Sequence, residues 1–164
     1  MSFADFYQPG VPAEIELPTR PLVDLVDRAV AAAPDNVATD FFGHTMTYRE
    51  FGDRVARAAE GLRRLGVRPG DRVAIVLPNC PQHLVAFYAV LRLGAVVVEH
   101  NPLYTDRELR HMFEDHAARV AICWDAAVPK LNRQPDDIAI DHIVAVHLLE
   151  EFPAHLRLAL RLPV

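Results

Sequence analysis

The sequence predicts an α/β fold, in which a doubly wound and largely parallel sheet carries helices on both faces. Three short runs, VAIVL at 73–77, AVVV at 95–98 and VAIC at 120–123, contain only apolar residues. Strands of a parallel sheet that helices cover on both faces have this composition. Segments with helical spacing alternate with these runs through short loops, which is the order of a doubly wound sheet.

Two helix starts carry the same local signal, a capping box. Its threonine hydroxyl and its glutamate carboxylate each satisfy a backbone amide that the first helical turn leaves free. The two boxes are Thr47 with Glu50 and Thr105 with Glu108. Apolar residues flank both boxes at the positions of a hydrophobic staple, and these are Met46 with Phe51 and Tyr104 with Leu109. The stretch NPLYTDREL at 101–109 therefore predicts a tight loop followed by a capped helix.

The first third of the chain predicts an arm, a helix and a hairpin. Four prolines and glycines break up residues 1–18, which we expect to form an irregular arm. A helix is expected over about 20–33, where Pro34 stops it. Its apolar face is predicted to consist of Leu22, Leu25, Val26, Ala29 and Val30. Two short strands around Gly43 and His44 then form a hairpin by their turn chemistry.

The middle of the chain gives the most regular pattern. A helix is expected over 48–65, with Gly66 at the position that follows its end. Its apolar face is Phe51, Val55, Ala58, Leu62 and Leu65. After the strand that begins near 71, Pro81 opens a third helix and Gly94 ends it. That helix is predicted to bury Leu84, Phe87, Tyr88 and Leu91.

The last third of the chain continues the alternation and then becomes ambiguous. We expect a strand at 95–99, a helix at 106–117, a strand at 119–124, a short helix near 126–131 and a strand near 142–147. Beyond that, Leu156, Leu158, Leu160 and Leu162 alternate as in a strand, whereas Leu149, Phe152, Leu156 and Leu160 fit a helix. We divide the chain into the arm 1–18, an α/β subdomain 19–148 and a truncated apolar segment 149–164.

Composition excludes several classes of protein. The net charge of −5 provides no basic field, which argues against a nucleic-acid binder. No apolar run approaches the roughly 20 residues of a membrane span, and the first residues lack a signal-peptide pattern. We therefore expect a cytoplasmic protein, with Cys80 and Cys123 as reduced, buried thiols.

Several active-site chemistries are also excluded. Ser2 is the only serine and Lys130 the only lysine, and neither a G-x-S-x-G nor a G-x-G-x-x-G motif is present. Gly61 and Gly66 have the spacing of a phosphate loop, but Val67 follows where that loop needs lysine. His111 and His116 are five residues apart rather than the four that place two metal ligands on one helical face.

The part of the chain from about 45 to 123 resembles the N-terminal portion of the adenylate-forming, or AMP-binding, superfamily, and most of all its long-chain fatty acid–CoA ligases. Four pieces carry the resemblance in the same order: TYREF at 47–51, GDRVAIVLPN at 70–79, AFYAVLRLGAVVV at 86–98 and NPLYTDREL at 101–109. The resemblance implies the N-terminal subdomain of an enzyme that converts a fatty acid, ATP and CoA into acyl-CoA, AMP and pyrophosphate through an acyl-adenylate.

The family's phosphate loop, nucleotide-binding motifs and catalytic lysine are not matched by any part of this sequence, so no catalytic residue is carried over. The resemblance places ATP, Mg²⁺ and CoA in a full-length parent and predicts that this chain alone is inactive and binds none of them. Three other interpretations stay open. The chain is alternatively a nucleotide-binding α/β module, a non-catalytic dimerisation module, or part of a fatty acyl-AMP ligase that serves a carrier protein.

Three polar residues at strand ends are the candidates for lining a substrate site, namely Asn79, His100 and Asn101. Ligands of doubly wound sheets lie beyond the carboxyl ends of the strands. The competing interpretation is that these side chains only cap their own loops. Trp124, Phe113 and Tyr88 are interpreted as core rather than as the wall of a lipid tunnel.

The partners follow from the same resemblance. We expect a fatty acid substrate in the parent enzyme and no nucleic acid. Two further contacts stay open: a homodimer formed through the arm, and a peripheral membrane contact through the apolar, weakly basic segment HLRLALRL at 155–162.

Overall fold

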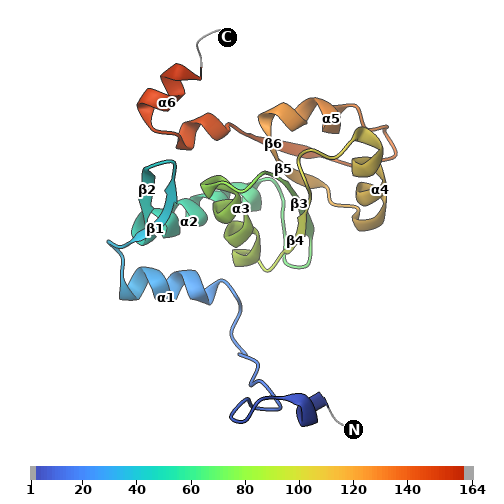
Figure 1. The fold of residues 1–164 in the computed structure, drawn as a ribbon. Coiled ribbons are helices and arrows are strands. Elements are labelled where there is room, and N and C mark those ends of the chain that lie inside the picture. The colour runs from blue at the N-terminus through green and yellow to red at the C-terminus, as the bar shows by residue number, and fades with distance from the viewer. Residues whose placement is uncertain (1–2, 161–164) are drawn as a thin grey trace.

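A parallel sheet forms the centre of the computed structural model, which describes residues 3–160. Within these residues, the sheet has four strands in the order β4-β3-β5-β6 (Figure 1). The strands are β3 (Arg72–Val76), β4 (Val96–Glu99), β5 (Val120–Trp124) and β6 (His142–Val146). Every pairing in this sheet is parallel, and Ala74 in the middle of β3 pairs with both Val98 and Ala121. All four strands therefore end at the same edge.

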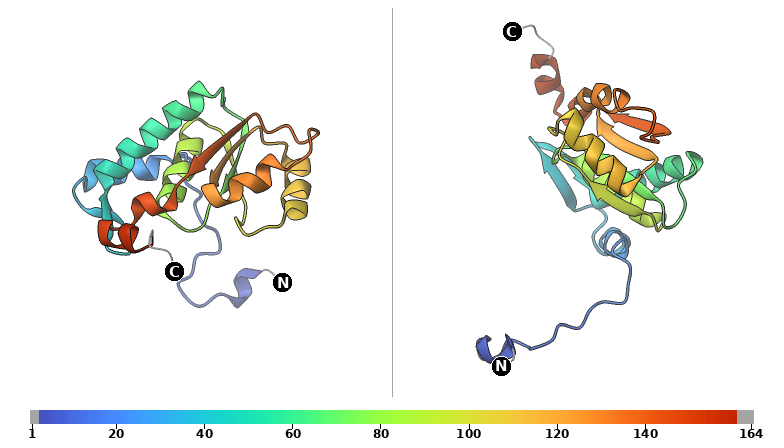
Figure 2. Two further views of the ribbon diagram at one scale, coloured as in Figure 1. Left: turned by 90° about the horizontal axis from the view of Figure 1, so that it is seen from above. Right: turned by 90° about the vertical axis from the view of Figure 1, so that its right-hand side faces the viewer.

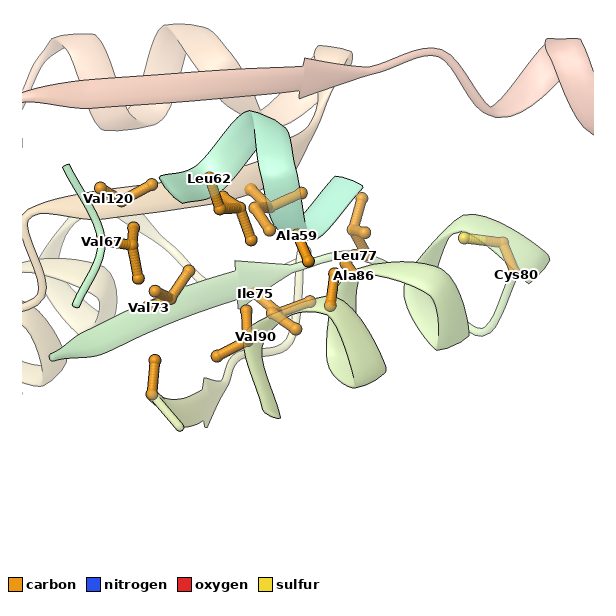
Figure 3. Packing of buried hydrophobic residues seen from close by; sticks show 13 residues of the cluster. Ala59, Leu62, Val67, Val73, Ile75, Leu77, Cys80, Ala86, Val90 and Val120 are labelled. Carbon is orange, nitrogen blue, oxygen red and sulfur yellow. The ribbon is translucent and has the colours of Figure 1, made fainter. Parts of the chain in front are cut away.

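Helices cover the sheet on both faces, as the sequence predicts. Helices α2 (Tyr48–Arg64) and α3 (Pro81–Arg92) pack on the face of Val73 and Ile75 (Figure 3). Helices α4 (Asp106–His116) and α5 (Val128–Asn132) pack on the opposite face, against Ala74 and Val76. Alternate residues of β3 thus belong to two separate cores, because successive side chains of a strand point to opposite faces. The doubly wound prediction is confirmed.

The outer strands depart from the expectation of burial on both faces. The run AVVV was expected to be covered twice, but β4 is an edge strand and the side chain of Val96 is 47% exposed. β6 forms the other edge and is also only half-buried. An apolar composition alone does not distinguish a central strand from an edge strand, since neighbours in space decide it.

Both capping boxes are present. In each, the backbone N–H of the threonine donates to the glutamate Oε2 at 2.8 Å, and the glutamate N–H donates to the threonine Oγ1 at 3.3 Å. The staple partners meet as well. Tyr104 packs against the apolar cluster that contains the fully buried Leu109, and Met46 and Phe51 lie together in another apolar cluster.

The first helix is shorter than predicted and buries less. It is α1 (Asp24–Ala32), and Val26 is its buried residue, whereas Leu22 and Leu25 are about half exposed. Helix α1 packs against α2, and its Asp27 pairs with Arg92 at the end of α3. Before it, the short 3₁₀ helix η1 (Phe3–Phe6) and the following residues extend away from the body (Figure 2).

The predicted hairpin is confirmed as β1 (Val37–Phe41) paired antiparallel with β2 (His44–Thr47). The third helix, by contrast, buries a different face from the one predicted. Small residues of α3, which are Ala86, Ala89 and Val90, pack on the sheet, while Leu84 is 44% exposed. Because α3 is apolar around much of its surface, the small side chains that allow close approach determine which face meets the sheet.

The C-terminal segment is helical where it is described, which resolves the ambiguity in its pattern. The 3₁₀ helix η2 (Asp125–Ala127) leads from β5 into α5. After β6 come the 3₁₀ helix η3 (Leu148–Glu151) and α6 (Ala154–Ala159), whereas Leu162 lies outside the described residues. Glu151 is buried and anchors η3, because its carboxylate accepts from Arg54 Nη1 at 2.5 Å. The subdomain limits at 18/19 and 148/149 stay predictions.

Candidate functional site

A pocket of about 610 Å³ opens at the edge where the parallel strands end. The ends of β4 and β5 and the segments that follow β3, β4 and β6 contribute to its walls. The lining residues are Leu77, Pro78, Asn79, His83, Glu99, His100, Asn101, Pro102, Leu103, Trp124 and Leu148. The structure therefore brings together all three sequence candidates, Asn79, His100 and Asn101. We call this cavity the carboxyl-edge pocket.

Asn101 forms the turn that the sequence predicts. Its side-chain Oδ1 accepts from the backbone N–H of Leu103 at 2.9 Å, and its carbonyl oxygen accepts from the Tyr104 N–H at 3.1 Å. The Asn101 side chain thus caps its own loop, as the competing interpretation holds. The exposed side chain of Asn79 makes no hydrogen bond within the described residues, so its amide is free to meet a ligand.

Lys130 holds the same loop from the opposite side, a role that sequence reasoning missed. Its Nζ donates to the Tyr104 carbonyl at 2.8 Å and to the Pro102 carbonyl at 3.3 Å. The helix α5 that carries Lys130 packs beside α4. The only lysine of the chain is therefore a structural tie in this structure, since both of its acceptors are backbone oxygens.

Two histidine–carboxylate pairs stand at the same edge of the sheet and were also missed. His83, in the first turn of α3, lies with its Nε2 2.9 Å from Glu99 Oε1 at the end of β4. His147, which follows β6, lies with its Nδ1 2.7 Å from Asp125 Oδ2, which follows β5. Their partners are 16 and 22 residues apart, so no local spacing reveals them. Only the rule that parallel strands end at one edge could have predicted from the sequence that these side chains meet.

His100 lines the pocket but is almost fully buried. Its side chain is on the α4 side of the sheet, stacked on Phe113 with ring centroids 5.5 Å apart. Its Nε2 lies 3.0 Å from Nε2 of His116, at the end of α4. Burial lowers the pKa of His100 to about 4 and lowers the pKa of His116 as well. Both rings are therefore neutral at pH 7.

The chemistry of the pocket is that of a binding surface. Its wall combines apolar side chains, such as Trp124 and Leu148, with amides and paired histidines. Burial raises the pKa of both cysteine thiols, that of Cys123 to about 11, so neither is a thiolate nucleophile. The described residues contain no group of three or more side chains placed to hold a metal ion.

A second cavity, of about 400 Å³, lies at the opposite edge of the sheet, where the strands begin. Charged residues line it, and Arg119 and Asp141 there are paired with each other at 2.6 Å. Because this cavity is at the amino ends of the strands, the carboxyl-edge pocket is the better candidate.

The sequence itself matches a known family over most of its length. Residues 26–158 match the family described as AMP-binding enzyme. The chain belongs to this family. It is 33% identical to the long-chain-fatty-acid–CoA ligase of Bacillus subtilis over 147 residues, which cover 90% of the chain and 26% of that protein. It is 37% identical to the enzyme of the same name from Escherichia coli O6:H1, with 87% and 26% covered.

Solved structures agree with the AMP-binding assignment. The N-terminal domain of FACL13 from Mycobacterium tuberculosis superposes with a TM-score of 0.71 and 25% identity, covering 81% of this chain and 35% of that one. A long-chain-fatty-acid-CoA ligase (FadD1) from Archaeoglobus fulgidus shares the fold with a TM-score of 0.76, at 24% identity and with 89% and 32% covered.

These comparisons confirm the family that the motifs at 47–109 indicate. They also show that this chain spans about a quarter of the length of the relatives it matches. Across residues 3–160, no helix combines the length and the apolar character that crossing a bilayer requires.

Proposed function

We propose that this chain, a member of the AMP-binding enzyme family, is the N-terminal α/β part of a fatty acid–CoA ligase, which joins a fatty acid to CoA through an acyl-adenylate. The observation that carries the proposal is 33–37% identity to long-chain-fatty-acid–CoA ligases over about nine-tenths of the chain. The parallel sheet with helices on both faces, shared with the solved ligase domains, supports it.

The residues described here do not fit the ATP and Mg²⁺ of that reaction. A phosphate group needs a glycine-rich loop or a helix start with free amides, and no such loop is in the sequence. No three carboxylates or histidines of the described residues converge on a metal position. We therefore propose that the chain alone is inactive, and that other sequence supplies the groups for ATP, Mg²⁺ and the acyl transfer to CoA.

Within that enzyme, we propose that the carboxyl-edge pocket contributes to the substrate site. Asn79 offers a free amide at its mouth, while Asn101 and His100 shape the wall through the loop of residues 100–105. The apolar part of the wall, with Leu77, Trp124 and Leu148, suits a ligand with apolar groups.

A chimeric ligase tests the proposal. The matching N-terminal segment of the Bacillus subtilis ligase is replaced by this chain, and fatty-acid-dependent release of AMP and formation of acyl-CoA are measured. We expect both products, and we expect no AMP from the chain alone. A chimera that folds and binds ATP but consumes no fatty acid would refute the ligase proposal. Fatty-acid-dependent release of pyrophosphate with accumulation of acyl-AMP, unchanged by CoA, would favour the fatty acyl-AMP ligase alternative.

The arm supports a second role, self-association. Its apolar side chains are largely uncovered, and Phe3, Ile15 and Leu17 are each more than 80% exposed. Covering them in a homodimer would remove this apolar surface from water. Sedimentation of the chain with and without residues 1–18 tests this, because only the intact chain should associate.

A membrane contact through the exposed Leu158 and Leu160 is tested by flotation with anionic vesicles.

A nucleotide-binding module without ligase chemistry is the remaining alternative. Calorimetric titration of the chain with ATP separates it from the ligase proposal, which predicts no heat of binding here. Tight binding of ATP to the chain alone would favour the module.

A further inference from the structure

The contact between His100 and His116 is a buried hydrogen bond between two uncharged rings. Their Nε2 atoms are 3.0 Å apart, and both side chains are more than nine-tenths buried. Only one of the two nitrogens can carry a hydrogen in such a contact, because two N–H groups would point at each other.

A backbone amide decides which nitrogen that is. The N–H of Ala118 donates to His116 Nδ1 at 3.0 Å, so this nitrogen carries no hydrogen. A neutral His116 therefore has its hydrogen on Nε2 and donates it to Nε2 of His100. His100 in turn has its hydrogen on Nδ1, a buried atom that has no partner among the described residues. The arrangement holds only while both rings are neutral.

We propose that His100 and His116 form an acid-sensitive latch, which holds the loop of residues 100–105 against helix α4 while both rings are neutral and releases it when either ring is protonated. A proton added to His100 Nε2 places two N–H groups face to face. A proton added to His116 Nδ1 removes the acceptor of the Ala118 amide. Each event breaks one hydrogen bond of a buried side chain, which costs free energy.

The charged groups around the two histidines do not cancel the cost of protonating them. Asp115 on α4 favours the protonated form of His116, whereas Arg72 at the start of β3 disfavours it. His116 itself disfavours a charge on His100. Glu99 is the last residue of β4 and directly precedes His100, so its side chain points to the other face of the sheet, where it pairs with His83. Burial is the larger influence on both rings.

The direction of the pH dependence follows from these positions. The pKa of His100 is about 4 in the folded chain against an ordinary value of 6.5, which applies when the chain unfolds. The stability that depends on the neutral ring is complete above pH 6.5 and is lost as the pH falls from 6.5 toward 4. Over that range, the unfolding equilibrium constant should rise on the order of 10²-fold because of His100.

The loop that the latch holds is also a wall of the carboxyl-edge pocket. Asn101, Pro102 and Leu103 line the pocket directly after His100. Lys130 holds the far end of the loop through the Tyr104 carbonyl, so the latch controls the end nearest the strand. Release of the latch therefore changes the shape of this wall.

The test compares urea midpoints from pH 7.5 to 4.5 for three chains. They are the wild type, the double variant His100→Gln/His116→Gln and the control His111→Gln. Glutamine keeps a donor and an acceptor but does not titrate, and His111 is an exposed histidine of the same helix. We expect the midpoint of the double variant to fall less with acid than that of the wild type, while the control follows the wild type. Parallel loss in all three would overturn the latch.

NMR on the unchanged chain decides the question even if the double variant fails to fold. At pH 7, the ¹⁵N signals should show hydrogen on Nδ1 of His100 and on Nε2 of His116. Amides of residues 100–105 should lose their protection from exchange at the pH where the rings become charged. Rings that become charged near pH 6.5, or a loop that stays protected after they do, would refute the proposal.

Discussion

Replacing Lys130 by methionine should loosen the loop of residues 100–105 without unfolding the protein. Methionine keeps most of the apolar stem of lysine and removes only the ammonium group, which donates to the carbonyls of Tyr104 at 2.8 Å and Pro102 at 3.3 Å. A hydrogen bond to a charged group contributes roughly 1.5–3 kcal/mol when its partner stays buried.

The expected magnitude is at the lower end of that range. The loop is partly exposed, so water can replace the ammonium group at both carbonyls. We expect a loss of about 1.5 kcal/mol, since one good bond and one long bond are exchanged for bonds to water. With a denaturant slope of about 2 kcal/mol per molar, the urea midpoint falls by roughly 0.7 M. The amides of Leu103 and Tyr104 should exchange about ten times faster.

A matched control separates this tie from general effects on α5. Arg133 follows the same helix and pairs with Asp106 at 2.8 Å, but its side chain is 58% exposed. The variant Arg133→Met should therefore cost less than about 0.5 kcal/mol, as exposed ion pairs contribute little. If Lys130→Met leaves both the midpoint and the exchange of the loop unchanged, or if Arg133→Met has the larger effect, Lys130 is not the tie that the geometry indicates.

Three further perturbations test the packing around the site. Leu109→Ala should destabilise the chain by about 3 kcal/mol in urea unfolding, because the fully buried Leu109 fixes α4 to the sheet; a loss below about 1 kcal/mol would contradict this. Ala117→Gly should raise the stability by about 0.5–1 kcal/mol in thermal unfolding, since Ala117 ends α4 with a φ of 50° that glycine adopts without strain; a lower melting temperature would argue against strain there. At pH 8, Cys123 should react with a thiol reagent far more slowly in the folded than in the unfolded chain, because burial raises its pKa to about 11; equal rates would show that the thiol is accessible.

Short stretches of the sequence determine much of the local structure of this chain. Thr47 with Glu50, and Thr105 with Glu108, form the capping boxes that their spacing predicts, because a cap depends on residues three positions apart. The strands and their parallel order follow from apolar runs that alternate with amphipathic helices. The three candidate residues at the strand ends meet in one pocket because parallel strands end at one edge of the sheet.

The predictions that failed depend on neighbours in space. The sequence placed Leu84 in the core and Val96 in a strand covered on both faces, yet each is nearly half exposed. Periodicity identifies an apolar face, but it does not say which of two apolar faces meets the sheet or which strand lies at the edge. The small residues Ala86 and Ala89 decided which face of α3 meets the sheet. The strand order β4-β3-β5-β6 placed β4 at the edge.

The sequence by itself determined the family, the fold class and the edge of the sheet where a ligand is expected. Only the tertiary structure decided which groups at that edge are hydrogen-bonded to each other. His100 contacts His116, Glu99 contacts His83, and Lys130 donates to the loop carbonyls. These partners are 16 to 28 residues apart. Hydrogen bonds over such distances form because packing brings separate elements together, and no local pattern in the chain encodes them.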